Sequence, residues 1–98
     1  MHVGICRLTL LLPENGSLKE KRQVVRSITT RVRNTFNVAI AEVADNDLWQ
    51  RLTLGVSCVS NDARHANQVL SQVVQFIQQE TRGEVELLDY EIELVSGV

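Results

Sequence analysis

Residues 3–20, VGICRLTLLLPENGSLKE, decide the fold, because a strand pattern gives way to a helix start within this one stretch. Every second position of its first half is apolar, as expected for a strand with one buried face. These positions are Cys6, Leu8, Leu10 and Leu12. Pro13 ends the strand, and Asn15-Gly16 supplies a turn. The pattern therefore predicts a half-buried strand over residues 3–12.

The stretch SLKE, residues 17–20, has the spacing of a capping box. The hydroxyl of Ser17 can accept from the amide of Glu20, whose carboxylate can accept from the amide of Ser17. A helix is therefore predicted to start here and to continue to about Thr35. Its buried stripe recurs at three- and four-residue steps, at Val24, Val25, Ile28 and Val32.

A hairpin, a second helix and a last strand complete the pattern. The second strand contains Val38 and Ile40, and a loop with Asp45 through Leu48 leads to a third strand, apolar at Leu52, Leu54, Val56 and Cys58. The second helix can be capped by Ser60, Asn61 or Asp62, and it buries Ala66, Val69, Leu70, Val73, Val74 and Ile77. In the last strand, about Val85 to Val95, the apolar phase changes from odd to even positions, which predicts a bulge or a late start.

Two β-α-β units with right-handed crossovers form a four-stranded antiparallel sheet with both helices on one face. We therefore predict a single α+β domain over residues 1–98, a ferredoxin-like β-α-β-β-α-β sandwich. The first and third strands are then central neighbours, which brings Cys6 close to Cys58 on the helix-covered face. Because neither cysteine has CxxC spacing and the expected compartment is reducing, we predict two neighbouring free thiols.

No feature of the chain indicates an enzyme, a cofactor or a metal. A glycine-rich phosphate loop, a nucleophile elbow and a pair of inward carboxylates are all missing from the sequence. Asp45-Asn46-Asp47 resembles the start of a calcium loop, but Trp49 and Gln50 stand where that loop needs a ligand and a glycine. Asp62 beside His65 is explained by helix capping. The longest aliphatic block, residues 10–12, is far too short to span a bilayer, so we expect a cytoplasmic protein.

Four stretches carry a family resemblance: SLKEKRQVVRSI, FNVAIAEV, DLWQRLTLGVSCVSND and VELLDYEIEL. In this order they resemble the bacterial YlxP-like family, a domain family of unknown function, over nearly the whole chain. The resemblance implies a ferredoxin-like fold. Members are often encoded beside translation and ribosome-maturation factors, which implies by association a role near RNA or the ribosome. Family members often have Asp-His-Gln before Asp-Leu-Trp, whereas this chain has Ala44-Asp45-Asn46, so no histidine is available there.

Charge is distributed unevenly along the chain. The net charge of −2 and the pI near 5.6 argue against a protein that coats nucleic acid generally. Six basic residues lie in the first helix with one acidic residue, a local charge of +5: Lys19, Lys21, Arg22, Arg26, Arg31 and Arg33, with Glu20. At 100° per residue, Lys19, Arg22, Arg26 and Arg33 fall within an arc of about 60°. Such a row can bind phosphates, helped by the amides of the helix start, or can simply be a solvated helix face.

The sheet face that the helices leave open is predicted to carry small, mildly apolar and lightly charged side chains. Its residues are Arg7, Thr9, Leu11, Ala39, Ala41, Val43, Thr53, Gly55, Ser57 and Val59. The central strands offer no aromatic ring on which a base could stack, so this face does not bind RNA as an RNA-recognition motif does. It can serve as a dimer contact. Six acidic residues near the C-terminus form a pole of opposite charge: Glu80, Glu84, Glu86, Asp89, Glu91 and Glu93.

The sequence thus predicts an accessory protein, not an enzyme, that contacts RNA or a ribonucleoprotein. Its candidate contact residues are Lys19, Lys21, Arg22, Arg26, Arg33, Trp49 and Arg51. The alternative is a homodimeric protein-interaction or small-ligand-sensing module that uses the open sheet face. Trp49 and Arg51 share one phase of the third strand and are expected to stand side by side, whereas Leu48, Gln50 and Leu52 are expected to point inward or into the base of the loop. Whether Trp49 braces the loop or anchors a partner is left open.

Overall fold

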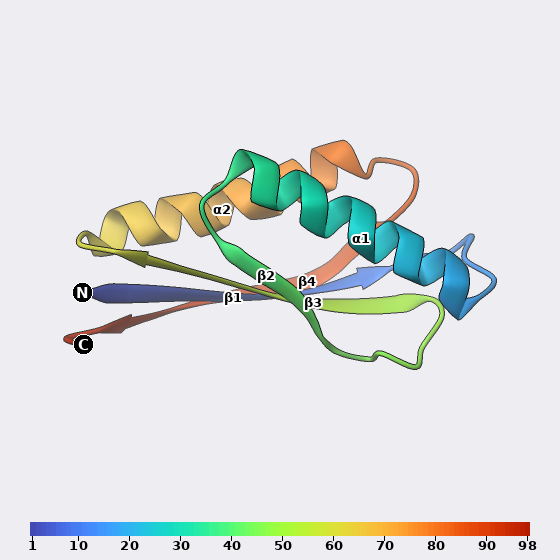
Figure 1. Ribbon diagram of the computed structural model, residues 1–98, viewed down its shortest axis with the longest axis horizontal. Helices are drawn as coiled ribbons and strands as arrows, with labels where there is room; N and C mark the ends of the chain where they lie inside the picture. Colours follow the sequence, from blue (N-terminus) through green and yellow to red (C-terminus); the bar gives the residue numbers. More distant parts are fainter.

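The computed structural model describes all 98 residues and contains four strands and two helices. Their order is β1 (His2–Leu11), α1 (Leu18–Thr35), β2 (Ala39–Ala44), β3 (Arg51–Ser60), α2 (Ala63–Glu80) and β4 (Glu86–Ser96). The strands form one antiparallel sheet in the order β2-β3-β1-β4. Both helices lie on the same face of this sheet (Figure 1). The predicted ferredoxin-like arrangement is confirmed.

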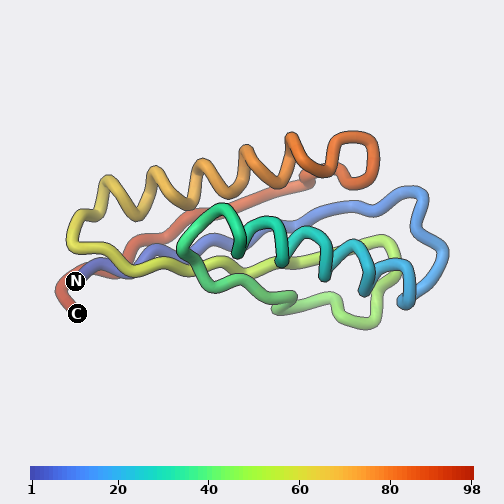
Figure 2. The backbone as a smooth tube through the Cα atoms, turned by 45° about the horizontal axis from the view of Figure 1, so that its top comes forward, coloured from blue at the N-terminus to red at the C-terminus, as the bar shows by residue number.

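The two ends of the molecule differ in what they contain (Figures 1 and 2). Both termini lie at one end of the sheet. The β1–α1 connection and the β2–β3 loop lie together at the other end, beside the start of α1 (Figures 1 and 2). Neither helix has both the length and the apolarity that crossing a membrane requires.

The core is a single cluster of 16 buried apolar residues between the sheet and the helices. The even positions of β1 are almost completely buried, as the two-residue period predicts. Asp62 caps α2 by accepting from the amide of Arg64 at 2.9 Å. Of the three caps that the sequence allowed, the structure uses this one.

A β-bulge in β4 explains the change of apolar phase in the last strand. Thr9 pairs with Asp89, whereas Leu10 pairs with Leu87, so Leu88 has no partner in β1. The extra residue turns Leu87 towards the core and leaves Leu88 exposed. The predicted bulge is therefore confirmed.

The two cysteines lie on the helix-covered face, as predicted, and are both buried and free. Cys6 pairs with Val56 and Cys58 pairs with Gly4, so the thiols occupy diagonal positions on adjacent strands. Burial raises the pKa of the Cys6 thiol to about 11 and also raises the pKa of Cys58. Both groups are therefore neutral and poorly nucleophilic near neutral pH.

Neither thiol is expected to react with Ellman's reagent in the native protein at pH 8, because both are buried and protonated. In guanidinium chloride both should react at the rate of a free cysteine. Absorbance of the released thionitrobenzoate measures the two reactions. Rapid modification of either cysteine without denaturant would show that the thiols are more accessible than their burial implies.

Candidate functional site

Lys21 is buried, which corrects the prediction that placed it on the basic surface. Only 1% of the residue is exposed. Its ammonium donates to the backbone carbonyl of Asp45 at 2.6 Å and lies 2.9 Å from Oε2 of Glu42. Oε2 of Glu42 is buried and has no hydrogen-bond partner, so the ammonium compensates it by charge. Lys21 thus connects α1 with β2 and with the loop that follows β2.

The sequence contained a signal for this burial. Lys21 precedes Val25 by four residues and Ile28 by seven, so it lies in the phase of the buried stripe of α1. A basic residue in that phase either reaches out to solvent along its methylene stem or finds a carboxylate inside. The even phase of β2 supplies that carboxylate, at Glu42.

Asp45 shapes the start of the β2–β3 loop. It is the one residue other than glycine with a positive φ, at 59°, a conformation that aspartate adopts more readily than most residues. Its Oδ2 accepts from the hydroxyl of Thr53 at 2.7 Å and from Nε of Arg51 at 3.2 Å. The Thr53 hydrogen bond, and after it the Arg51 charge, lower the pKa of Asp45. Arg51 is therefore engaged within its own hairpin.

Backbone carbonyl groups hold this loop against the β1–α1 connection. The amide of Leu12 donates to the carbonyl of Gln50 at 2.8 Å, and the Gln50 side chain donates to the carbonyl of Pro13 at 3.3 Å. Nδ2 of Asn15 donates both to the carbonyl of Trp49 and to that of Ser17, the N-cap of α1. Hydrogen bonds to backbone carbonyl groups therefore hold the loop beside the first turn of α1.

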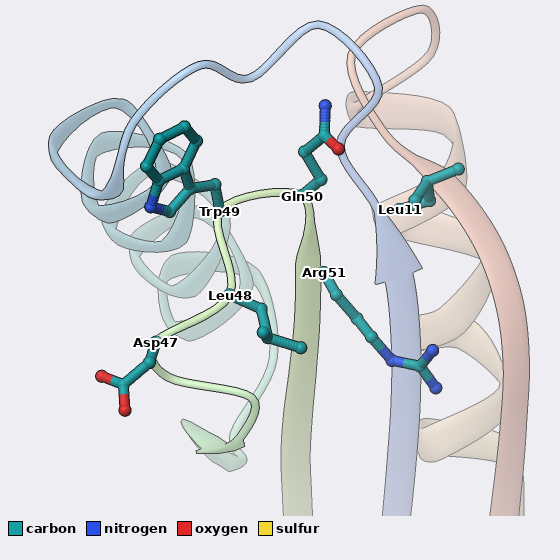
Figure 3. Close-up of a pocket in the computed structure, with 6 residues that line it drawn as sticks. All are labelled: Leu11, Asp47, Leu48, Trp49, Gln50 and Arg51. Carbon is teal, nitrogen blue, oxygen red and sulfur yellow. The ribbon is translucent and has the colours of Figure 1, made fainter.

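The side chain of Trp49 is 54% exposed, and that of Leu48 is 48% exposed. Figure 3 shows the indole turned to one side of the loop, and Leu48 and Arg51 turned to the other. The expectation that Trp49 and Arg51 stand side by side is wrong, because β3 begins only at Arg51 and Trp49 belongs to the loop. Leu52 is buried as expected, whereas Leu48 and Gln50 are exposed.

A shallow hollow lies around this loop (Figure 3). Its volume is about 430 Å³, and it is lined by Leu11, Asp47, Leu48, Trp49, Gln50 and Arg51. The lining combines apolar side chains with one carboxylate and one guanidinium. Such a surface can hold a flat or apolar group, but it encloses none.

The remaining basic residues of α1 divide by the element they face. Arg31 lies against α2, where it donates to the carbonyl of Glu80 at 3.1 Å and lies 3.8 Å from its carboxylate. Arg33 lies over β2 and donates to the carbonyl of Ile40 at 2.9 Å. Lys19, Arg22 and Arg26, in the same angular arc as Arg33, are exposed and make no ion pair or side-chain hydrogen bond. We call these three residues the basic ridge; it lies on the flank of α1 above the β2 edge of the sheet.

The start of α1 differs from the expectation of open amides that attract an anion. The amide of Glu20 donates to Oγ of Ser17 at 3.1 Å, and the Glu20 carboxylate accepts from the amide of Gly16 at 3.1 Å. The capping box is thus confirmed, with Gly16 in place of Ser17 as one donor. Because the Glu20 carboxylate already occupies the first turn, it competes with any external anion there.

The fold and this surface define a small ferredoxin-like α+β protein that presents a row of unpaired cations and an exposed tryptophan loop. The chain belongs to the family described as "Protein of unknown function (DUF503)", whose model matches residues 3–92. It is 40% identical over 75 residues to the uncharacterized protein YlxP of Bacillus subtilis (strain 168), a match that covers 76% of this chain and 82% of the relative. The resemblance to the YlxP-like family is confirmed.

Solved structures with the same fold share little sequence with this chain. SnoaB, a cofactor-independent oxygenase from Streptomyces nogalater, matches with a TM-score of 0.52 at 12% identity, over 98% of this chain and 92% of its own. A dimeric ferredoxin-like protein from an uncultured marine organism matches with a TM-score of 0.51 at 8% identity, over 100% and 99% of the two chains. The fold thus occurs both in enzymes and in dimers, and at these identities the likeness concerns the fold alone.

Replacement of Lys21 by Met is expected to lower the free energy of unfolding by about 3 kcal/mol, because it leaves the Glu42 carboxylate buried without a countercharge. This is the lower end of the range for such pairs, since 19% of the Glu42 side chain is exposed. The double variant Lys21→Met/Glu42→Leu should recover most of the loss. Urea denaturation measures the free energy of unfolding of the wild type and of both variants. A single variant as stable as the wild type would show that the ion pair is not a structural element.

Proposed function

We propose that this protein binds RNA, free or within a ribonucleoprotein particle, through the basic ridge of α1. The observation that supports the proposal is the difference between the ridge and the other basic residues near it. Lys21, Arg31, Arg33 and Arg51 each bind an acceptor of their own chain. Lys19, Arg22 and Arg26 have no acceptor, so their charges are available to a partner.

The dimensions of the ridge suit a nucleic-acid backbone. From Lys19 to Arg26 the helix rises roughly 10 Å, at 1.5 Å per residue. That length corresponds to about three phosphates of one strand. Arginine adds bidentate hydrogen bonds to phosphate oxygens, whereas lysine adds a point charge. A ridge of this size supports modest affinity with a strong dependence on salt.

The acidic residues determine which side of the protein can face a phosphate backbone. Three acidic residues of β4 pair with residues of β1 that face the open side of the sheet: Asp89 with Thr9, Glu91 with Arg7 and Glu93 with Ile5. The three carboxylates therefore lie on the open sheet face. Phosphates are repelled from that face and attracted to the flank of α1 at the opposite edge. The protein therefore binds RNA in one orientation. In this proposal it acts in the cytoplasm as a binding module, not as a catalyst.

A second candidate function is self-association through the open sheet face, and one observation favours it. Ile5 and Val59 are exposed there, and Val43 lies over Gly55, where a side-chain carbon would meet it at 2.7 Å. The apolar part of the face lies on β2, on β3 and on the side of β1 next to β3, because β4, on the other side of β1, contributes carboxylates. A homodimer would bury this part. Small-ligand sensing would then need a site between the two subunits.

Charge reversal tests the main proposal. The double variant Arg22→Glu/Arg26→Glu should bind a labelled structured RNA hairpin at least tenfold more weakly than the wild type, measured by fluorescence anisotropy at low salt. For the wild type, the logarithm of the binding constant should fall with the logarithm of salt concentration with a slope of about −2 to −3, as expected for about three phosphate contacts.

The matched control is Arg64→Glu/Arg82→Glu, which makes the same change in net charge at exposed positions outside the ridge. It should bind RNA within about twofold of the wild type, because local charge contributes more than net charge at short range. Equal losses in both double variants would contradict a specific role for the ridge. A dimer in light scattering, with no RNA affinity even at low salt, would instead support the second candidate.

A further inference from the structure

We infer that Trp49 is a stacking platform for an unpaired base, so that the RNA bound by the basic ridge carries an unpaired nucleotide beside the phosphates that the ridge contacts. The inference rests on the proposed function and adds to it a class of RNA. It follows from the position of the loop, from the way the indole is held, and from the chemistry of the neighbouring side chains.

Trp49 lies at the end of the basic ridge. Asn15 bridges the carbonyl of Trp49 and that of Ser17, so the loop residue sits directly beside the first turn of α1. Lys19, the first residue of the ridge, lies in that turn. Figures 1 and 2 place the loop and the start of α1 at the same end of the molecule. An RNA strand that follows the ridge towards Lys19 therefore approaches the loop that carries Trp49.

The indole is presented by a loop that is ordered before binding. The Lys21 ammonium holds the carbonyl of Asp45, the amide of Leu48 donates to that same carbonyl at 3.0 Å, and the Leu12 amide holds Gln50. A backbone carbonyl accepts each of these hydrogen bonds, and none involves the indole nitrogen. A ring that is half exposed on a fixed backbone loses little conformational entropy when a flat partner stacks on it. The hydrogen bonds that hold the loop come from other residues, and the exposed part of the indole is open to a flat partner.

An unpaired base is the group that suits both the ring and the ridge. Bases stack on tryptophan only when they are not stacked within a duplex, and this contact tolerates any base because each has a π-face. An apolar peptide side chain would also fit the ring. However, the basic ridge begins at Lys19, in the helix turn beside the Trp49 loop, and its three cations favour an anionic chain next to the flat group.

Three RNA hairpins of equal length test the inference: one fully paired, one with a single unpaired adenosine, and one with an abasic site in place of that adenosine. The wild type should prefer the unpaired adenosine over the other two by roughly 5- to 150-fold, the range for one stacked base. Because Trp49 is the only tryptophan, its intrinsic fluorescence should be quenched by the RNA with the unpaired base and by neither of the others.

Variants separate this inference from the proposed function. Trp49→Ala should bind all three hairpins with the affinity that the wild type has for the paired one, and Trp49→Phe should keep part of the preference. Arg22→Glu/Arg26→Glu should lose binding to all three. Melting temperatures of the Trp49 variants close to that of the wild type establish that the fold is intact. If Trp49→Ala is unstable, the inference is tested by the fluorescence of the wild type and by the binding of Trp49→Phe to the three hairpins.

Equal binding of the unpaired and abasic hairpins, with unchanged Trp49 fluorescence, would overturn the inference while leaving salt-dependent binding by the ridge in place. In that outcome the indole is left for a protein partner. Failure of every hairpin to bind at low salt would overturn the proposed function and this inference together.

Discussion

The buried ammonium of Lys21 is the constraint on which the functional surface depends. A charged amine inside a small protein is costly unless a countercharge and hydrogen-bond acceptors surround it. Lys21 finds them in Glu42 of β2 and in the carbonyl of Asp45. Because the three groups come from a helix, an edge strand and a loop, satisfying this one charge determines where the loop lies relative to the helix.

The remaining surface follows from that placement. With Lys21 turned inward, Arg22 and Arg26, about 100° and 140° further round the helix, point out over the β2 edge. With the carbonyl of Asp45 held, the loop turns back towards the β1–α1 connection, and Asn15 ties Trp49 to the beginning of the helix. The beginning of the basic ridge at Lys19 and the loop residue Trp49 thus lie at the same end of the molecule, although they are far apart in the sequence.

Local patterns predicted the fold well and the surface less well. The strand phases and the limits of α1 depend on neighbouring residues and could be predicted from them. The cap of α2 was narrowed to three residues, of which the structure uses Asp62, and the irregularity of the last strand to a bulge or a late start, of which it shows a bulge at Leu88. Counting charges along α1 overestimated the basic surface, because it treated Lys21 as exposed although its position in the buried stripe indicated otherwise. The direction of Trp49 could not be predicted, since it depends on the positive φ of Asp45 and on hydrogen bonds between residues more than thirty positions apart.

The central claim is that Lys21 holds the β2–β3 loop, which carries Trp49, in place. Amide hydrogen exchange at Leu48 tests this claim most directly. The Leu48 amide donates to the carbonyl that Lys21 also binds. The measurement compares the wild type with Lys21→Met/Glu42→Leu, in which stability is largely retained but the contact with the loop is lost. The account predicts that the Leu48 amide exchanges much faster in this variant while amides of the β1–β3 ladder keep their protection. Unchanged protection at Leu48 would contradict it.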